Sequence, residues 1–383
     1  MRISVLKEDP GVEPRVAATP ETVKKFAALG ATVRVEAGAG VAAGLSDEQF
    51  RVAGAEIADA GMVVQDADLI LSVRRPVRLD GLRRGAALVA LMDPFGNEAA
   101  LARIAEAGLA AFSLELIPRI TRAQVMDVLS SQANLAGYQA VIEAAACFGR
   151  AMPMMMTAAG TVPAARVFIL GAGVAGLQAI ATARRLGAVV SATDVRPAAK
   201  EQVASLGAKF IAVEDEEFKA AETAGGYAKE MSREYQAKQS ALVASHIAKQ
   251  DIVITTALIP GRPAPKLLSR AMVASMAAGS VVVDLAVERG GNVEGSQPDQ
   301  VVQVDGVTII GYSNMAGRIA ASSSALLARN IYAFVEPMID KGAGALRINR
   351  EDPIVAATLL TADGAVVHPA FAPKAPAGEG GPI

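Results

Sequence analysis

The chain has 383 residues, a length that at about 150 residues per domain predicts two or three domains. Its 37 lysine and arginine residues nearly balance 39 aspartate and glutamate residues, so the formal charge is −2 and no basic nucleic-acid binder is expected. One cysteine and two histidines allow no intrachain disulfide and no zinc or haem site, so no metal is expected.

The beginning of the chain carries charged residues every few positions and no apolar stretch, so no secretory signal is predicted. The longest stretch without a charged residue, 167–183, contains three glycines and falls just short of a membrane-spanning helix. We therefore expect a cytoplasmic protein with no direct membrane insertion. Cys147 lies in an Ala-rich run and is expected to be a small buried side chain.

The first third of the chain alternates strand and helix patterns. Thr19, Pro20 and Glu21 supply an N-cap, a first-turn proline and a first-turn acid for a helix of about ten residues, which Gly30 ends. A second helix begins after Ser46. Apolar runs predict strands at 3–6, 32–36, 69–71, 87–91 and 110–114. Strands separated by helices predict a doubly wound α/β domain.

A long Ala-rich helix without proline is predicted over 128–148 and can bridge two domains. The alternation then starts again, with a helix at 174–186 and a second long helix at 318–339 that is suited to return the chain to the first domain. Further strands are predicted at 166–170, 189–193, 252–255, 281–285 and 307–310. These strands make a second Rossmann-like sheet.

The predicted fold class is therefore α/β, with two Rossmann-like doubly wound parallel-sheet domains joined by long helices. We assign residues 1–127 and 330–383 to the first, discontinuous domain and residues 128–329 to the second. The run Met152–Met156 is expected to be pliable packing between the domains.

Near the end of the chain, residues 354–360 and 365–368 are predicted to form a hairpin through Asp363-Gly364. The Pro-, Gly- and Ala-rich tail, 372–382, is expected to be disordered. The polar stretch 213–249 has two interpretations, a solvated helical excursion or a mobile flap hinged at Gly225-Gly226.

A glycine fingerprint, Gly171-Ala172-Gly173-Val174-Ala175-Gly176, follows a predicted strand and opens a predicted helix. In this context the first glycine permits a tight turn, the second lets backbone N–H groups approach a pyrophosphate, and the third lets helix and strand pack closely. The pattern predicts a dinucleotide site in the second domain; the alternative is that the glycines serve only a turn.

Asp194 lies 18 residues beyond the last of these glycines, at the end of the next predicted strand. A carboxylate there accepts hydrogen bonds from the adenosine ribose hydroxyls and repels a 2′-phosphate, which favours NAD over NADP. Arg196 is the competing signal, since a guanidinium could instead bind the 2′-phosphate. We give the aspartate more weight, and we include Val195 between them as a cofactor contact.

The chain carries six recognisable segments at 137–138, 154–161, 171–176, 192–196, 255–261 and 283–291. They closely resemble the NAD(H)-binding domain I of proton-translocating NAD(P) transhydrogenases. The fold is shared with alanine dehydrogenases, whose pattern also appears in 15–20 and 314–315, and these general segments do not separate the two kinds of enzyme. Two others separate them: 118–127 resembles the transhydrogenase loop of Arg, Gln and Asp that positions the nicotinamide, and 225–231 resembles its mobile loop.

The resemblance implies roles for particular side chains. Arg119, Gln124 and Asp127 would position the nicotinamide, and Ser130 would add a ribose or carboxamide contact. The alternative for Arg119 and Asp127 is a surface ion pair. The alternative for Ser130 is a helix N-cap. The remaining implied contacts to the nucleotide are Gly226 and Tyr227 in the mobile loop and Leu258, which would pack on the adenine or else be an ordinary core residue.

Alanine dehydrogenases use a lysine and a histidine to bind and polarise the keto acid. The corresponding stretches here carry Arg74 and Arg75, and no histidine in 88–93. Loss of an acid/base group costs a dehydrogenase about 10² to 10⁴ in rate. Hydride exchange between two nicotinamides needs no such group, so the absent histidine fits a transhydrogenase; Glu288, where dehydrogenases tend to carry Asp, decides nothing.

The resemblance thus implies a subunit that holds NAD(H) in the cleft between its two domains and exchanges hydride with NADP(H) on a partner. Implied partners are a second copy of the chain, a membrane-spanning subunit and an NADP(H)-binding beta subunit, which would place the protein on the cytoplasmic face of the inner membrane. Two alternatives are an alanine dehydrogenase-like oxidoreductase and a non-catalytic NAD sensor.

Overall fold

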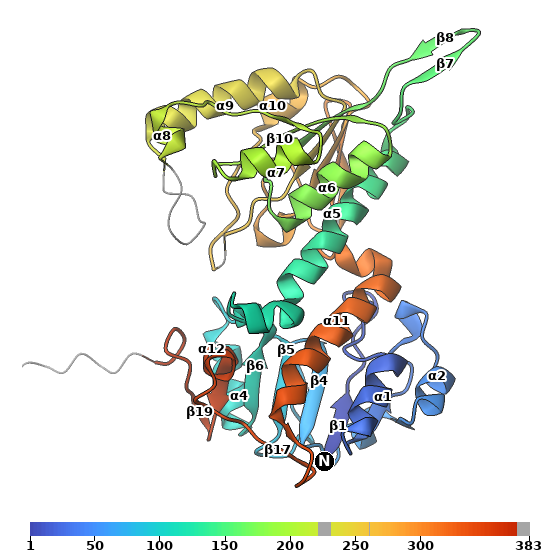
Figure 1. Ribbon diagram of the computed structural model, residues 1–383, viewed down its shortest axis with the longest axis vertical. Coiled ribbons are helices and arrows are strands. Elements are labelled where there is room, and N and C mark those ends of the chain that lie inside the picture. The colour runs from blue at the N-terminus through green and yellow to red at the C-terminus, as the bar shows by residue number, and fades with distance from the viewer. Residues whose placement is uncertain (221–230, 260, 374–383) are drawn as a thin grey trace, which may run out of the picture. The chain divides into compact units, whose positions relative to one another are not determined.

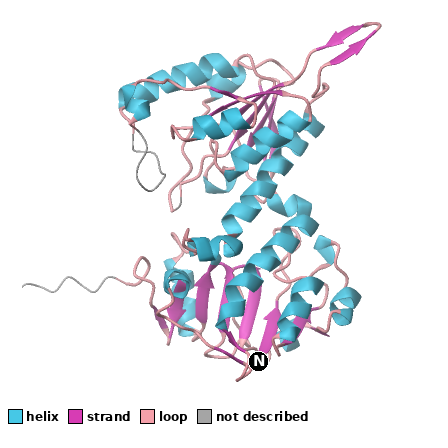
Figure 2. Ribbon diagram, viewed as in Figure 1, coloured by secondary structure: helices cyan, strands magenta, loops and turns pink. Residues whose placement is uncertain are grey.

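The computed structural model describes residues 1–220, 231–259 and 261–373. The chain divides into two compact units, one formed by Met1–Gln132 with Gly317–Ile383 and the other by Ala133–Ala316. Each unit is an α/β domain built on a mainly parallel sheet (Figures 1 and 2), which confirms the predicted fold class. The predicted position of a nucleotide between the domains stays a prediction.

Unit 1 is built on an eight-stranded sheet in the order β19-β18-β6-β5-β4-β1-β2-β3. The strands are β1 (Arg2–Val5), β2 (Thr32–Glu36), β3 (Glu56–Ala58), β4 (Leu69–Arg74), β5 (Ala87–Leu91), β6 (Ala110–Ser113), β18 (Leu359–Ala362) and β19 (Ala365–Val366). The strands from β6 to β3 are parallel, and β18 and β19 add an antiparallel edge. The strand order reverses beside β1, as in doubly wound folds.

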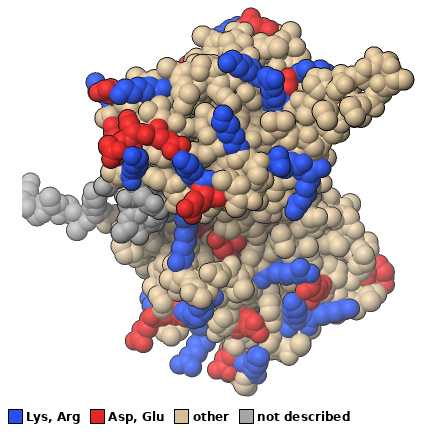
Figure 3. All heavy atoms as spheres, turned by 45° about the horizontal axis from the view of Figure 1, so that its top comes forward, with Lys and Arg blue, Asp and Glu red and all other residues tan. Residues whose placement is uncertain are grey.

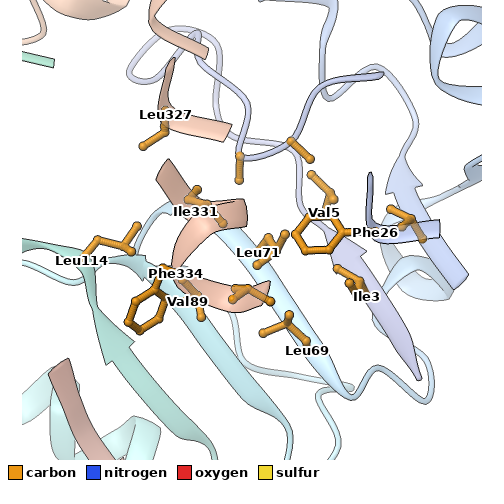
Figure 4. Close-up of a cluster of buried hydrophobic side chains, with 14 of the residues drawn as sticks. Ile3, Val5, Phe26, Leu69, Leu71, Val89, Leu114, Leu327, Ile331 and Phe334 are labelled. Atoms are coloured by element: carbon orange, nitrogen blue, oxygen red, sulfur yellow. The ribbon is translucent and has the colours of Figure 1, made fainter. Parts of the chain in front are cut away.

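Helices α1 (Pro20–Ala28), α2 (Asp47–Val52), α3 (Ala60–Val63), α4 (Glu98–Glu106), α11 (Ala320–Val335) and α12 (Pro353–Thr358) belong to this unit. Figure 4 shows Leu327, Ile331 and Phe334 of α11 packed into the core cluster that also holds Leu71 and Val89 from the sheet. Burying each such side chain contributes about 1.5–3 kcal/mol. Helix α11 is therefore firmly attached to unit 1.

Local signals set the start of α1 as the sequence predicts. Thr19 and Thr22 cap one another, since Thr22 Oγ1 accepts from Thr19 N at 2.9 Å and Thr19 Oγ1 accepts from Thr22 N at 3.5 Å. Gly30, just past the helix, has φ +82°, a conformation that favours glycine.

Unit 2 contains a seven-stranded sheet in the order β11-β10-β9-β12-β13-β15-β14, parallel except for β14. The strands are β9 (Arg166–Leu170), β10 (Val189–Thr193), β11 (Lys209–Phe210), β12 (Ile252–Thr255), β13 (Val281–Asp284), β14 (Gln300–Val304) and β15 (Val307–Gly311). Its helices are α6 (Val174–Arg185), α7 (Ala199–Ser205), α8 (Glu216–Lys219), α9 (Arg233–Ile247) and α10 (Arg270–Ala274), and α5 (Val128–Cys147) enters it from unit 1.

The hairpin predicted near the end of the chain is confirmed around its turn, but the first part of its first strand is wrong. Strands β18 and β19 pair across Asp363-Gly364, both with positive φ, as an Asp-Gly hairpin turn requires. Residues 354–358 lie in helix α12 instead of a strand, because Asp352 accepts from Ile354 N as N-cap and Pro353 fits the first turn. Most of the tail lies outside the described residues.

Two further expectations were wrong. Cys147, expected to be buried, is exposed at the end of α5. In the methionine run, Met152 is buried in the core of unit 2, but Met154, Met155 and Met156 are exposed. Met154 precedes β7 (Met155–Thr157), and the other two lie in it; β7 pairs with β8 (Gly160–Val162) in a hairpin that projects from the body of unit 2 (Figure 1).

Candidate functional site

The glycine loop joins β9 to α6 with a different role for each glycine. Gly171 has φ +103°, and a Cβ on it would lie 2.4 Å from Thr256 Oγ1. A Cβ on Gly176 would lie 1.8 Å from the Gly171 carbonyl oxygen, so only glycine allows helix and loop to pack this closely. A Cβ on Gly173 would meet nothing within 4 Å, which leaves open space in front of the loop.

The first turn of α6 is open to an anion. Gly173 is the N-cap of this helix and supplies no side-chain acceptor, so no cap side chain satisfies the first N–H groups. Val174, the first helical residue, is exposed beside it. An open helix N-terminus with space in front of it fits a phosphate group. Gly137 on α5 also supports the loop, because a Cβ there would lie 2.0 Å from the Ala175 carbonyl oxygen.

Asp194 follows β10 and lies against the glycine loop. Its carboxylate accepts from Ala172 N at 2.7 Å and from Arg196 N, Nε and Nη2 at 2.9, 2.9 and 3.0 Å. Arg196 also donates from Nη2 to the Ala172 carbonyl oxygen at 3.2 Å. The structure therefore brings the sequence-predicted Asp194, Arg196 and Ala172 together, with Val195 exposed beside them.

Leu258 lies in the loop after β12, on the same carboxyl edge of the sheet as the glycine loop. Its side chain is 54% exposed, so it is not an ordinary core residue. Asn292 holds this loop, since its Oδ1 accepts from Ala257 N at 3.0 Å and its Nδ2 donates to the Ala257 and Pro265 carbonyl oxygens at 2.9 and 2.8 Å. Leu258 is thus presented outward on a fixed loop.

Asp284, a buried carboxylate with no predicted role, organises this edge. It is fully buried at the end of β13 and accepts from the backbone N–H groups of Ala286, Asn292 and Val293 at 3.0–3.1 Å. A Cβ on Gly291, which has φ +78°, would lie 2.6 Å from Asp284 Oδ2. The available signal was an acid directly after an apolar strand.

The second group of predicted site residues lies in unit 1, on the turn η3 (Thr121–Met126) and the start of α5. Ala123 and Met126 are buried and attach the turn to the core, while Gln124 in the turn and Arg119 just before it are exposed. Buried and exposed residues thus alternate so that the turn is fixed while its polar side chains face outward.

Asp127 and Ser130 are brought into direct contact at the end of this turn. The Asp127 carboxylate accepts from Ser130 N at 2.8 Å and from Ser130 Oγ at 2.6 Å. Asp127 is therefore the N-cap of α5, and Ser130 returns a hydrogen bond to it. The contact leaves the carboxylate in a fixed orientation at the helix start.

Gly226 and Tyr227, the predicted mobile-loop contacts, lie outside the described residues. The segments on either side of them are attached to unit 2. Phe218 and Tyr235 stack at 6.4 Å between ring centroids, and burial raises the pKa of Tyr235 to about 12. Gln239 of α9 donates from Nε2 to Thr193 Oγ1 at 2.9 Å.

The arginines that stand where alanine dehydrogenases carry lysine are engaged within unit 1. Arg74 Nε donates to Glu13 Oε2 at 3.0 Å, and Arg75 Nη1 donates to the Met92 carbonyl oxygen at 2.6 Å. Burial acts to raise the pKa of Glu13, but Arg15 and Arg74 outweigh it and lower the pKa. Glu13 also lines a cavity of about 220 Å³.

Charges of both signs are interspersed over the face drawn in Figure 3, in keeping with the formal charge of −2. In the part of the chain that the structure describes, no helix has the length and apolar character needed to cross a membrane. The same residues contain no group of three or more His, Cys, Asp and Glu side chains placed to hold a metal ion.

Comparison with known proteins identifies the family of this chain. Residues 4–136 match the family described as "Alanine dehydrogenase/PNT, N-terminal domain", and residues 140–369 match "Alanine dehydrogenase/PNT, C-terminal domain". The chain is 51% identical over 379 residues to an NAD(P) transhydrogenase subunit alpha polypeptide of Rhodospirillum rubrum, covering 97% of this chain and 99% of that polypeptide. A solved transhydrogenase from Sinorhizobium meliloti is 61% identical, with a TM-score of 0.88 over 96% of this chain and 100% of that chain.

Alanine dehydrogenases are more distant. The alanine dehydrogenase of Halomonas elongata is 30% identical, covering 97% of this chain and 96% of that protein. The identity to the transhydrogenase polypeptide of Rhodospirillum rubrum is higher, 51% against 30%. The chain therefore belongs to the alanine dehydrogenase/PNT family, and within it to the NAD(P) transhydrogenase alpha subunits.

Proposed function

We propose that this chain is the NAD(H)-binding subunit of a proton-translocating transhydrogenase and passes hydride between NADH and NADP⁺ held by a partner. The observation that carries the proposal is the 51% identity to a transhydrogenase alpha-subunit polypeptide over 99% of its length. The open, uncapped start of α6 behind the glycine loop supports a dinucleotide as the ligand, through its pyrophosphate.

The glycine loop and Asp194 would hold the adenosine half of NAD(H). The N–H groups at the start of α6 would bind the pyrophosphate, and Asp194 would accept hydrogen bonds from the ribose hydroxyls. Arg196 is paired with Asp194, which supports our weighting of the aspartate over the arginine. Leu258, exposed on its fixed loop, would cover the adenine.

The turn in unit 1 would orient the nicotinamide. When bound, this ring supplies the hydride, and the protein's contribution is to fix its position and exclude water. Gln124 carries an amide that can hydrogen-bond a carboxamide or ribose, and Arg119, five residues earlier, is exposed as well. Asp127 and Ser130, joined at the start of α5, would provide a preoriented acceptor.

The alternatives have weaker support. An alanine dehydrogenase-like oxidoreductase needs an acid/base group, and segment 88–93 contains no histidine. The lower identity to alanine dehydrogenase, 30%, points the same way. A non-catalytic NAD sensor would need only the glycine loop, and it would bind NADH without passing the hydride on.

The name of the relatives, subunit alpha, supports a complex of several subunits. We propose a membrane-spanning subunit and an NADP(H)-binding beta subunit as partners, with the assembly on the cytoplasmic face of the inner membrane. We also propose a homodimer. The exposed methionines at the base of the β7–β8 hairpin support it, because projecting apolar side chains are typical of contact surfaces.

One assay separates the three functions. The purified chain is given NADH with pyruvate and ammonium, and then NADH with the NADP⁺-loaded partner subunits. Transfer that requires the partner supports the proposal. Turnover of pyruvate would support the dehydrogenase, and NADH binding without either reaction would support the sensor; both outcomes would refute the proposal.

A further inference from the structure

Asn330, a nearly buried residue of α11, bonds to the end of the turn that carries the predicted nicotinamide contacts and to the first turn of α5. Its Nδ2 donates to the Val125 carbonyl oxygen at 2.8 Å, and its Oδ1 accepts from Ser131 Oγ at 2.7 Å. The side chain is 9% exposed. Val125 is the last but one residue of the turn and Ser131 lies in the first turn of α5, so one amide joins the two.

The chemistry of the two partners fixes the orientation of this amide. The Val125 carbonyl can only accept, so it must face the NH₂ group, and the Asn330 oxygen then faces Ser131. Ser131 Oγ also lies 3.1 Å from the Val128 carbonyl oxygen, but Asn330 Oδ1 is the nearer acceptor, at 2.7 Å. No other arrangement of the side chain satisfies both partners.

Helix α11 provides a rigid base for Asn330. The next residue, Ile331, and the neighbouring Leu327 and Phe334 lie in the core cluster with the sheet of unit 1 (Figure 4). Asn330 therefore fixes the turn relative to the core of unit 1. It does so although it lies 205 residues from Val125 along the chain.

Three of the residues that the proposed function needs lie between the two bonds or directly beside them. Gln124 precedes Val125, and Asp127 and Ser130 lie between Val125 and Ser131, bonded to each other. Besides its buried residues Ala123 and Met126, the turn is attached by an ion pair of Arg122 with Asp352, in which the arginine is exposed. An exposed pair holds a loop weakly, so the buried amide is the stronger constraint.

We propose that Asn330 is a positioning residue for hydride transfer, which keeps Gln124, Asp127 and Ser130 in their productive placement without touching the nucleotide. This inference rests on the proposed function. Displacing reacting groups by about 1 Å costs about a hundredfold in rate, whereas binding of a dinucleotide along its whole length is affected far less.

The test uses Asn330→Asp, which keeps the shape and the acceptor for Ser131 but replaces the donor to Val125 by an oxygen. In the complex with the partner subunits we expect the transfer rate at saturating NADH to fall about tenfold to a hundredfold. The Kd for NADH should change less than about threefold. Arg329→Ala is the matched control, because it removes an exposed bond from the same helix to Glu21 of α1 and should leave the rate unchanged.

Ser131→Ala is the second variant and decides the question if Asn330→Asp does not fold. It removes one of the two bonds, and the rate should fall by about threefold or more with the thermal midpoint nearly unchanged. If Asn330 had a merely structural role, the amount of folded protein, the amount of NADH bound and the transfer rate would fall in parallel. That result would overturn the inference, and so would full activity in both variants. Absence of transfer in the wild-type complex would instead refute the proposed function.

Discussion

Replacing two glycines of the same loop should separate folding from nucleotide binding. At Gly176 a Cβ would lie 1.8 Å from the Gly171 carbonyl oxygen, so helix and loop must move apart by at least about 1.2 Å to reach the 3.0 Å minimum of real contacts. Overpacking of this kind costs about 1–3 kcal/mol. Alanine's higher helix propensity returns about 0.8–1 kcal/mol of that. Because the clashing atom is backbone and cannot rotate away, we expect the cost to lie at the upper end, a net of about 2 kcal/mol. Gly176→Ala should then lower the melting temperature by several degrees.

Gly173→Ala should instead weaken nucleotide binding and leave the stability nearly unchanged. A Cβ there meets nothing within 4 Å and the backbone has φ −76°, so alanine fits without strain. The free energy of unfolding should change by less than about 1 kcal/mol. The new methyl group would occupy the space in front of the helix N-terminus, and affinity for NADH should fall at least about tenfold, or 1.4 kcal/mol.

Differential scanning calorimetry and NADH titration of both variants make the measurement. Wild-type stability in Gly176→Ala would show that the close approach of helix and loop is not a constraint on the fold. Wild-type affinity in Gly173→Ala would show that the nucleotide does not approach the loop at this point, and the site assignment would fail.

Four other outcomes are expected. Asp194→Ala should weaken NADH binding and narrow the preference over NADPH in parallel titrations; equal affinities in the wild type would contradict the assignment. Gln124→Ala should leave NADH affinity within about tenfold but slow transfer much more in the reconstituted complex; an unchanged rate would make the residue structural. The hydrogen bond from Arg329 lowers the pKa of Glu21 to about 2, so this stabilisation is present above about pH 4.5 and is lost as the pH falls towards 2. Glu21→Gln should remove that loss in acid melts, an effect of under about 1 kcal/mol at an exposed pair. Burial lowers the pKa of His246, so the folded state favours the neutral imidazole. The resulting stabilisation is complete above about pH 6.5 and is lost as the pH falls through the lowered pKa. Its NMR titration should have a midpoint below 6.5.

The glycine loop and the first helix could be predicted because their signals are local. Gly171 and Gly176 each permit a contact that no other residue allows, and Thr19 caps a helix that starts one residue later. Local signals also explain one error: Asp352 and Pro353 start a helix, but the apolar run that follows them has the composition of a strand.

Other features depend on contacts far apart in the sequence. Asn330 meets Val125, and nothing in the residues around either one indicates the other. Asp284 could be noticed as an acid after an apolar strand, but its three backbone donors lie in a loop whose course the sequence does not show. The exposure of Met154 and Met156 follows from a projecting hairpin, which an apolar run alone does not distinguish from a buried segment.

The discontinuity of unit 1 has a consequence for synthesis on the ribosome. Strands β1 to β6 emerge first, but the helix that covers Leu71 and Val89 begins at Ala320. Unit 2 is continuous from Ala133 to Ala316 and is complete before that helix is made. We expect unit 2 to fold first during translation. Until α11 leaves the exit tunnel, the apolar face of the unit 1 sheet stays exposed, and we expect chaperones to protect it.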